Sequence, residues 1–207
     1  MSAENYIPRL PLPLAVLLLC AQFCIPGCQG ETARIPRPRA YPRIEFPART
    51  YVTFDMPDCP LSFSHPDYMT IVKRENLYDH SPAHPCWFDL EAQQLGATLH
   101  FSYYQIGSEK AFDDLVTDAF RMADRITQRA DYMDEIRVAN ANGVNGVIME
   151  FSGAAASPLH FYLSDSTAHF LKASLYFQTK VVPDSLAPVL DFLKEDLAAM
   201  INSLEFK

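Results

Sequence analysis

The sequence predicts an α+β fold, in which a mostly antiparallel sheet has helices packed against it. Short runs of aromatic and β-branched residues are separated by Pro, Asp, His and Gly, a pattern typical of strands. Two longer stretches instead repeat apolar residues every three or four positions, as helices do. These elements follow one another in the order strands, helix, strands, helix, which favours a layered α+β domain.

Length and charge limit the classes of function. The chain has 207 residues and is 49% hydrophobic, which suits one compact domain with its own core. Its formal charge of −8 makes it a poor candidate for binding the phosphate backbone of a nucleic acid, so we expect no such partner. The charge is unevenly distributed. Residues 31–49 hold five arginines against two glutamates, whereas residues 50–207 hold eleven basic and twenty-two acidic side chains, a balance of −11.

The amino terminus has the features of a lipoprotein signal. The apolar run from Leu12 to Phe23 is about a dozen residues long, short of the roughly 20 that span a bilayer, and it suits a signal-peptide core. The segment Ile25-Pro26-Gly27-Cys28 follows and resembles a bacterial lipobox. We therefore expect residues 1–27 to be a signal peptide and Cys28 to be lipidated, with acyl chains such as palmitate. The alternative is an ordinary secretory signal in which Cys28 is a buried cysteine.

Residues 28–49 are predicted to form an extended arm. Prolines recur between residues 35 and 47 and hold the backbone in a polyproline-like form, so the arginines project in several directions. One interpretation is a tether that lies near anionic lipid headgroups. The other is a docking peptide for a second envelope protein, whose binding residues would be Arg37, Arg39, Tyr41 and Arg43.

We predict that the first part of the domain is made of strands and that one helix follows. The strands are expected at Tyr51–Phe54, Met69–Lys73, Cys86–Leu90 and Thr98–Tyr104. From Ser108 to Ile136 the apolar residues then repeat with helical spacing, and Ser108 is the predicted N-cap. The opposite face of this helix is charged, which is expected of a solvated exterior or, alternatively, of a surface for a partner.

The order of elements then repeats. Asn142-Gly143 and Asn145-Gly146 predict a turn before a strand at Val147–Ser152. Residues 164–167 predict a hairpin turn between strands at Leu159–Leu163 and His169–Gln178. A final helix is expected to begin at Pro183 and to cover one face of the sheet with an apolar stripe, formed by Leu186, Val189, Leu190, Leu193, Leu197, Met200, Ile201 and Leu204.

Two cysteines, Cys59 and Cys86, follow the predicted lipidation site Cys28. An even pair in an oxidising compartment favours one disulfide, which would close a loop of about 27 residues and stabilise the fold by on the order of 3–4 kcal/mol. A metal site is the alternative, because His80, His84 and Cys86 lie close together in the sequence. Prolines on both sides of His84 prevent a helix from presenting the two imidazoles on one face, so we expect no metal.

Catalytic patterns are weak. Asp165, Ser166 and His169 are the residue types of a hydrolase triad, but they lie within one turn and lack a nucleophile elbow and nearby oxyanion glycines. We expect Ser166 and its neighbour Thr167 to hydrogen-bond the turn. His100, His160 and His169 lie in predicted strands beside aromatic residues, and we expect them to be structural or surface residues. The sequence therefore predicts no enzymatic activity and no cofactor.

Several segments taken together are typical of one family. They are the lipobox, the arm segment Pro-Arg-Pro-Arg-Ala-Tyr-Pro-Arg-Ile at residues 36–44, the segment Cys59-Pro60-Leu61-Ser62-Phe63 followed by Pro66-Asp67-Tyr68, and Cys86-Trp87-Phe88. In this combination the chain resembles the gliding-motility lipoproteins GldD of Bacteroidetes over nearly the whole mature sequence. The order of its elements is also similar to that of PsbP-like domains, a likeness of fold that carries no activity.

The resemblance implies an accessory envelope lipoprotein of the gliding motility and type IX secretion machinery, with no catalytic residues to transfer. It would act through protein-protein interaction with other gliding or secretion envelope proteins, and residues 50–207 would form a single domain. The alternative is a periplasmic lipoprotein that binds a ligand or glycan on an aromatic surface, such as Trp87, Phe88, Tyr103 and Tyr104. A third interpretation, an envelope hydrolase, lacks the usual sequence signatures.

The residues after Cys28 indicate which membrane holds the lipoprotein and which side it faces. They contain no run of acidic residues that would redirect a lipoprotein of this phylum to the cell surface, and Gln29 gives no inner-membrane retention signal. We therefore expect an outer-membrane lipoprotein that faces the periplasm, with a lipid anchor as its contact with the membrane and no small-molecule substrate.

Overall fold

The computed structural model describes residues 43–74, 82, 84–107, 110–179 and 182–207. Cys28, Arg37, Arg39, Tyr41 and His80 lie outside these described residues. The helices and strands are, in order, β1 (Tyr51–Thr53), β2 (Leu61–Ser62), β3 (Ser64–Pro66), β4 (Thr70–Lys73), β5 (Trp87–Ala92), the short 3-10 helix η1 (Gln93–Leu95), β6 (Ala97–Gln105), α2 (Phe112–Thr127), β7 (Met133–Ala139), β8 (Asn145–Phe151), β9 (Leu159–Ser164), β10 (His169–Phe177), α3 (Pro183–Ser203) and β11 (Glu205–Phe206). In the described part of the chain, no helix is long and apolar enough to cross a membrane.

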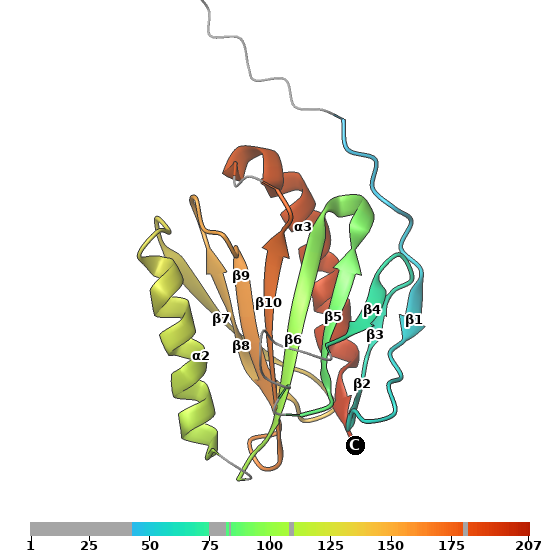
Figure 1. Cartoon of the computed structure of the whole chain (residues 1–207), viewed down its shortest axis with the longest axis vertical. Helices are drawn as coiled ribbons and strands as arrows, with labels where there is room; N and C mark the ends of the chain where they lie inside the picture. The colour runs from blue at the N-terminus through green and yellow to red at the C-terminus, as the bar shows by residue number, and fades with distance from the viewer. Residues whose placement is uncertain (1–42, 75–81, 83, 108–109, 180–181) are drawn as a thin grey trace, which may run out of the picture. The chain divides into compact units, whose positions relative to one another are not determined.

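The centre of the fold is one antiparallel sheet (Figure 1). Within the described residues it has seven strands in the order β4-β5-β6-β10-β9-β8-β7. Two small ladders lie beside it, in which β1 pairs with β3 and β2 pairs with β11. This architecture confirms the predicted α+β class with a mostly antiparallel sheet.

Helices α2 and α3 pack on opposite faces of the sheet. Successive residues of a strand point to opposite faces, and on β10 Phe170 packs with Leu115 and Ala119 of α2. Its neighbour Leu171 belongs instead to the main core, which also contains Leu193 and Leu197 of α3. The apolar stripe predicted for the last helix is therefore confirmed as the cover of one face.

The central helix is shorter than its apolar spacing predicted. It is capped at Ala111, not at Ser108, which lies outside the described residues, and it ends at Thr127. The predicted continuation to Ile136 is wrong, because Met133–Ala139 form β7. The spacing misled because Ala130 and Met133 do pack with the α2 residue Ala123 in one small apolar cluster, although they are no longer helical.

Two neighbouring glycines have different roles. Gly143 has a φ of +78° and lies in the turn between β7 and β8, which confirms the first predicted turn dipeptide. The prediction that Asn145-Gly146 also forms a turn is wrong, because both residues lie within β8. A Cβ at position 146 would lie 1.9 Å from the carbonyl oxygen of Tyr162, so glycine permits β8 to approach β9 closely.

A residue of the β7–β8 turn also caps the C-terminal end of α3. The side-chain amide of Asn140 donates hydrogen bonds to the carbonyl oxygens of Ile201 and Leu204, at 2.8 and 2.7 Å. Carbonyls at a helix C-terminus lack partners within the helix, so Asn140 satisfies them from a distant part of the chain.

Candidate partner-binding site

The end of the predicted arm packs on α3. Ile44 packs against the main core. Phe46 stacks on Phe192 of α3 with 4.5 Å between the ring centroids, and the Arg49 guanidinium lies 4.1 Å from the centroid of the same ring. Arg43, the one proposed docking residue that the structure describes, is exposed immediately before these contacts.

A buried carboxylate holds this segment in place. Asp196 on α3 is completely inaccessible to solvent. It accepts hydrogen bonds from Arg49 Nε at 3.0 Å, from the Tyr51 hydroxyl at 2.7 Å and from the Tyr68 hydroxyl. We call these four residues the Asp196 cluster. Because a buried charge needs both an opposite charge and hydrogen bonds, each of the three donors contributes to keeping Asp196 inside the fold.

The Asp196 cluster also shifts the acidity of its tyrosines. Burial and the nearby Asp196 carboxylate together raise the pKa of Tyr51 to about 12, and they raise the pKa of Tyr68 in the same way. Both phenols therefore stay protonated, as hydrogen-bond donors, at neutral pH.

Arg49 makes a second set of contacts at the surface. Its Nη1 lies 2.6 Å from Oε2 of Glu195, and its Nη2 donates to the carbonyl oxygen of Phe192 at 2.9 Å. The Glu195 side chain is 69% exposed, so this ion pair lies in solvent, whereas the pair with Asp196 does not.

Large apolar side chains are exposed next to the Asp196 cluster. Phe46 and Tyr51 are each 40% exposed and Val52 is 42% exposed. Together with Arg49 they form what we call the arm-base surface. Among the described strands β1 pairs with β3 alone, so its second backbone edge is open to another strand. Exposed aromatic side chains beside an arginine and an open strand edge are features of surfaces that bind proteins.

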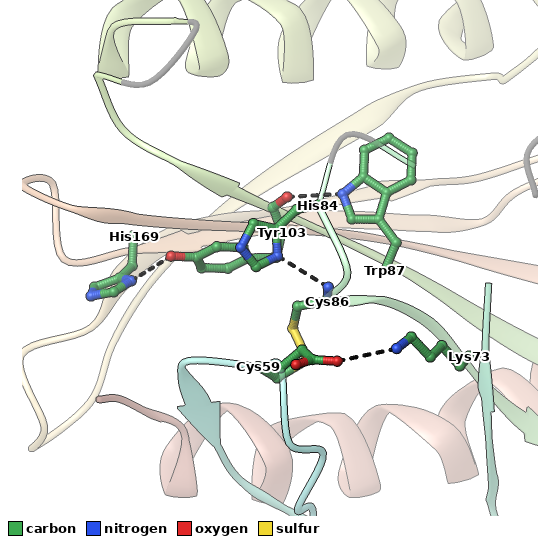
Figure 2. The surroundings of a disulfide bond; sticks show 8 residues. Cys59, Lys73, His84, Cys86, Trp87, Tyr103 and His169 are labelled. Atoms are coloured by element: carbon green, nitrogen blue, oxygen red, sulfur yellow. Dashed lines mark hydrogen bonds and ion pairs between the residues drawn. A yellow bond between two sulfur atoms is a disulfide. The ribbon is translucent and has the colours of Figure 1, made fainter. Parts of the chain in front are cut away.

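The two cysteines predicted to pair do form a disulfide (Figure 2). It joins Cys59, in the loop between β1 and β2, to Cys86 immediately before β5, with Cα atoms 4.8 Å apart. Because its sulfur is bonded to Cys59, Cys86 offers no thiolate to the alternative metal site. His84 Nδ1 accepts a hydrogen bond from the Cys86 backbone N–H at 3.0 Å.

The disulfide lies beside a hydrogen-bonded aromatic layer, whose side chains are shown in Figure 2. The indole N–H of Trp87 donates to the carbonyl oxygen of Tyr103 at 2.8 Å, and the Tyr103 hydroxyl is 2.7 Å from His169 Nδ1. His84 meets the Tyr103 ring edge-on at 4.7 Å, and burial lowers the pKa of its imidazole. These contacts link the disulfide to β6 and β10 and fix the loop that carries it.

The three residues that resemble a triad, Asp165, Ser166 and His169, lie in the turn between β9 and β10 and directly after it. The Asp165 carboxylate accepts hydrogen bonds from the backbone N–H groups of Thr167, Ala168 and His169 at 2.9–3.0 Å. Burial raises the pKa of Asp165, but these three donors outweigh it, so the net shift is downward. Ser166 has a φ of 63°. We predicted that the Ser166 and Thr167 side chains bond the turn, but the Asp165 side chain and the Ser164 hydroxyl do so.

The aromatic residues of the alternative ligand surface divide between the two faces of the sheet. Phe88 and Tyr103 are buried in the core on the α3 face. Trp87 and Tyr104 are partly exposed on the other face, where their rings meet edge-to-face at 5.5 Å. Sequence reasoning did not separate the two pairs, and it missed the Asp196 cluster. The sequence feature that could have indicated this cluster is Asp196 itself, an acidic residue on the apolar stripe of α3.

Comparison with known proteins finds one family whose model matches this chain. A family model described as gliding motility lipoprotein GldD matches residues 31–206. The curated proteins contain no match. Among solved structures, the chain is similar to the solution structure of cyanobacterial PsbP (CyanoP) from Synechocystis sp. PCC 6803, with 11% identity and a TM-score of 0.46, over 78% of this chain and 95% of that chain.

Proposed function

The chain belongs to the gliding motility lipoprotein family GldD, and we propose that it is a non-enzymatic accessory protein of the cell envelope that binds other proteins of the gliding motility and type IX secretion machinery. The observation that carries this proposal is the arm-base surface, where the apolar Phe46 and Val52 and the aromatic Tyr51 are exposed. A surface of this kind is typical of a site that another protein covers.

The Asp196 cluster supports the same function because it holds Arg49, the last residue of the arm, on α3. Arg49 and Tyr51 are held on α3 by their hydrogen bonds to Asp196. The proposed docking residues Arg37, Arg39, Tyr41 and Arg43 precede this point directly in the sequence. A partner could therefore contact the arm and the arm-base surface together, and binding two linked sites strengthens an interaction beyond either one alone.

We further propose that the protein is anchored through acyl chains on Cys28 and faces the periplasm from the outer membrane. The Cys59–Cys86 disulfide supports an oxidising compartment of this kind, because disulfides persist there and are rare in the cytosol. Two or more acyl chains hold a protein stably on a membrane, whereas a single chain binds reversibly. Residues 28–49 would then separate the membrane from the folded domain.

The experiment is affinity capture of the lipidated protein from solubilised envelopes, with the bound proteins identified by mass. We compare the wild type with a triple variant in which Arg37, Arg39 and Arg43 are replaced by Ala. The matched control replaces three exposed arginines elsewhere in the domain, Arg121, Arg129 and Arg137, by Ala. The arm variant is expected to lose gliding or secretion proteins that the control retains. Equal recovery of those proteins with all three forms would contradict the docking role of the arm.

A further inference from the structure

The sheet carries a groove on the face that α2 covers in part. Helix α2 packs on β8, β9 and β10, through clusters that include Met149, Tyr162 and Phe170. Beside the helix, over β5, β6 and β10, lies an open hollow of about 890 Å³. This volume is within the range of small-ligand sites in proteins.

The strand register explains which side chains line this groove. Trp87 on β5 is opposite Ser102 on β6, and Ser102 is opposite Lys172 on β10. Two residues further along, His100 is opposite Ser174. Because residues opposite one another point to the same face of a sheet, aromatic, hydroxyl and basic groups are brought together from three strands.

The groove is basic, although the folded domain is acidic. Its lining includes Arg74, His100, Arg125 and Lys172, and none of the described residues that line it is acidic. Residues 50–207 nevertheless carry twice as many acidic as basic side chains. Three Lys or Arg side chains and one His around this hollow therefore contrast with the acidic balance of the domain, and Asp89 lies beside two of them.

Two of these basic groups are paired with an acidic side chain on the same face of the sheet, because Asp89 lies opposite His100. The Asp89 carboxylate lies 2.6 Å from Arg74 Nε and 2.7 Å from His100 Nδ1. Burial raises the pKa of Asp89, but the hydrogen bonds from His100 and Arg74 outweigh it and lower the pKa overall. Asp89 thus orients both groups and offsets the positive charge of Arg74, although it is not itself among the residues that line the hollow.

The other two basic groups, Lys172 and Arg125, have no carboxylate bonded directly to them in the described part of the chain. Lys172 is partly buried, and its Nζ lies 5.5 Å from the centroid of the Tyr104 ring. Burial lowers the pKa of its ammonium group, and the nearby Asp118 carboxylate, which also binds Lys110 and Arg121, offsets only part of this shift. An anion bound at this point would further stabilise the charged form.

The remaining lining consists of aromatic rings and hydroxyl groups. Trp87, Tyr104 and Tyr176 provide apolar surface, and Ser102 and Ser174 provide hydroxyls. Apolar rings beside hydrogen-bonding groups suit a ligand with apolar faces and many hydroxyls, which is the chemistry of a sugar. The protein's own arm is a poor occupant, because it carries five arginines between residues 34 and 49.

We propose that this groove binds a small acidic saccharide, a sugar ring that bears a carboxylate or a phosphate. The anion pairs with Lys172 and Arg125, and the ring lies against Trp87 and Tyr104. This site goes beyond the proposed function and does not depend on it, because none of its residues belongs to the arm or to the arm-base surface.

The test uses the single tryptophan of the chain, Trp87, as a reporter within the site. The mature lipoprotein, in a polyoxyethylene detergent at low salt, is titrated with glucuronic acid and glucose 6-phosphate. Glucose, inorganic phosphate and tetraglutamate serve as comparison ligands. At least one acidic sugar is expected to change the fluorescence saturably, at a concentration at least about tenfold lower than glucose requires, since a charge-assisted contact is worth that factor.

Variants locate the site. Lys172→Gln and Arg125→Ala are each expected to weaken binding of the acidic sugar by about tenfold. Arg121→Ala, one turn earlier on the same helix and outside the groove, is expected to leave binding unchanged. The proposal is overturned if neither acidic sugar binds, if glucose binds equally well, if phosphate or tetraglutamate binds more tightly, or if all three variants bind like the wild type. None of these results affects the partner-capture experiment, so the two proposals fail separately.

Discussion

Arg49 and Asp196 are 147 residues apart in the sequence and 3.0 Å apart in the structure. Their contact joins the end of the arm to the last helix of the fold. The same arginine also binds the neighbouring Glu195, at 2.6 Å, so it meets one buried and one exposed carboxylate. This arrangement allows the contribution of burial to be measured with two adjacent residues.

Replacing Asp196 by Asn should destabilise the domain by about 2 kcal/mol. The amide keeps the shape of the side chain but removes the negative charge that offsets the partly buried Arg49 guanidinium. Glu195→Gln should change the stability by less than about 0.5 kcal/mol, because its ion pair with Arg49 is exposed. Urea unfolding of both variants measures the difference, and equal losses would show that the Asp196 cluster is not what holds the arm on α3.

Removing the disulfide should cost about 3–4 kcal/mol in the free energy of unfolding. A cross-link that closes a loop of 27 residues restricts the unfolded chain by about this amount. The variant with both Cys59→Ala and Cys86→Ala should therefore unfold at the same urea concentration as the reduced wild type, and reductant should not affect it further. A double variant as stable as the oxidised wild type would contradict the pairing.

Stability should fall on acidification because of His160. This imidazole is buried, and burial, with a smaller contribution from Lys172, lowers its pKa from 6.5 to about 4. Between these two values the unfolded chain binds a proton on this ring that the folded chain does not, so the folded state loses stability as the pH falls. From pH 7 to pH 5 the wild type should lose about 2 kcal/mol more than His160→Gln. Parallel pH dependences of the two proteins in urea unfolding would refute this assignment.

The two glycines of the β7–β8 region should respond differently to alanine. At position 146 the added Cβ would meet the backbone of β9, and backbone cannot move aside cheaply, so Gly146→Ala should cost more than about 2 kcal/mol. At position 143 nothing lies within 4 Å of the added Cβ, and only the positive φ is unfavourable, so Gly143→Ala should cost about 1 kcal/mol. Thermal unfolding of the pair tests this order, and the reverse order would place the close approach elsewhere.

Much of the fold could be predicted from the sequence because its strands and helices bury regular patterns. The α3 stripe and the apolar run of β10 are examples, since Leu193 packs in the main core and β10 buries Leu171 on one face and Phe170 on the other. Strand β7 could not be predicted in this way. It lies at the edge of the sheet and most of its residues are exposed, so no alternation of apolar residues marks it.

The candidate site could be predicted only in part. The pairing of Cys59 with Cys86 follows from counting cysteines, and the structure confirms it. Asp196 lies three residues after Leu193, on the apolar stripe, which marks it as a buried charge. Its partners Arg49 and Tyr51 are distant in the sequence, however, and only the folded chain brings them together.

The central claim, that the arm-base surface binds a partner protein, is tested most directly by cross-linking in living cells. A photoreactive amino acid is placed at Val52, which is 42% exposed within that surface, and in a second strain at Tyr132, which is 60% exposed beside the distant strand β7. Position 52 should yield an adduct with an identified protein of the gliding motility or secretion machinery, and position 132 should not. The absence of such an adduct at position 52, or the same adduct at both positions, would contradict the account.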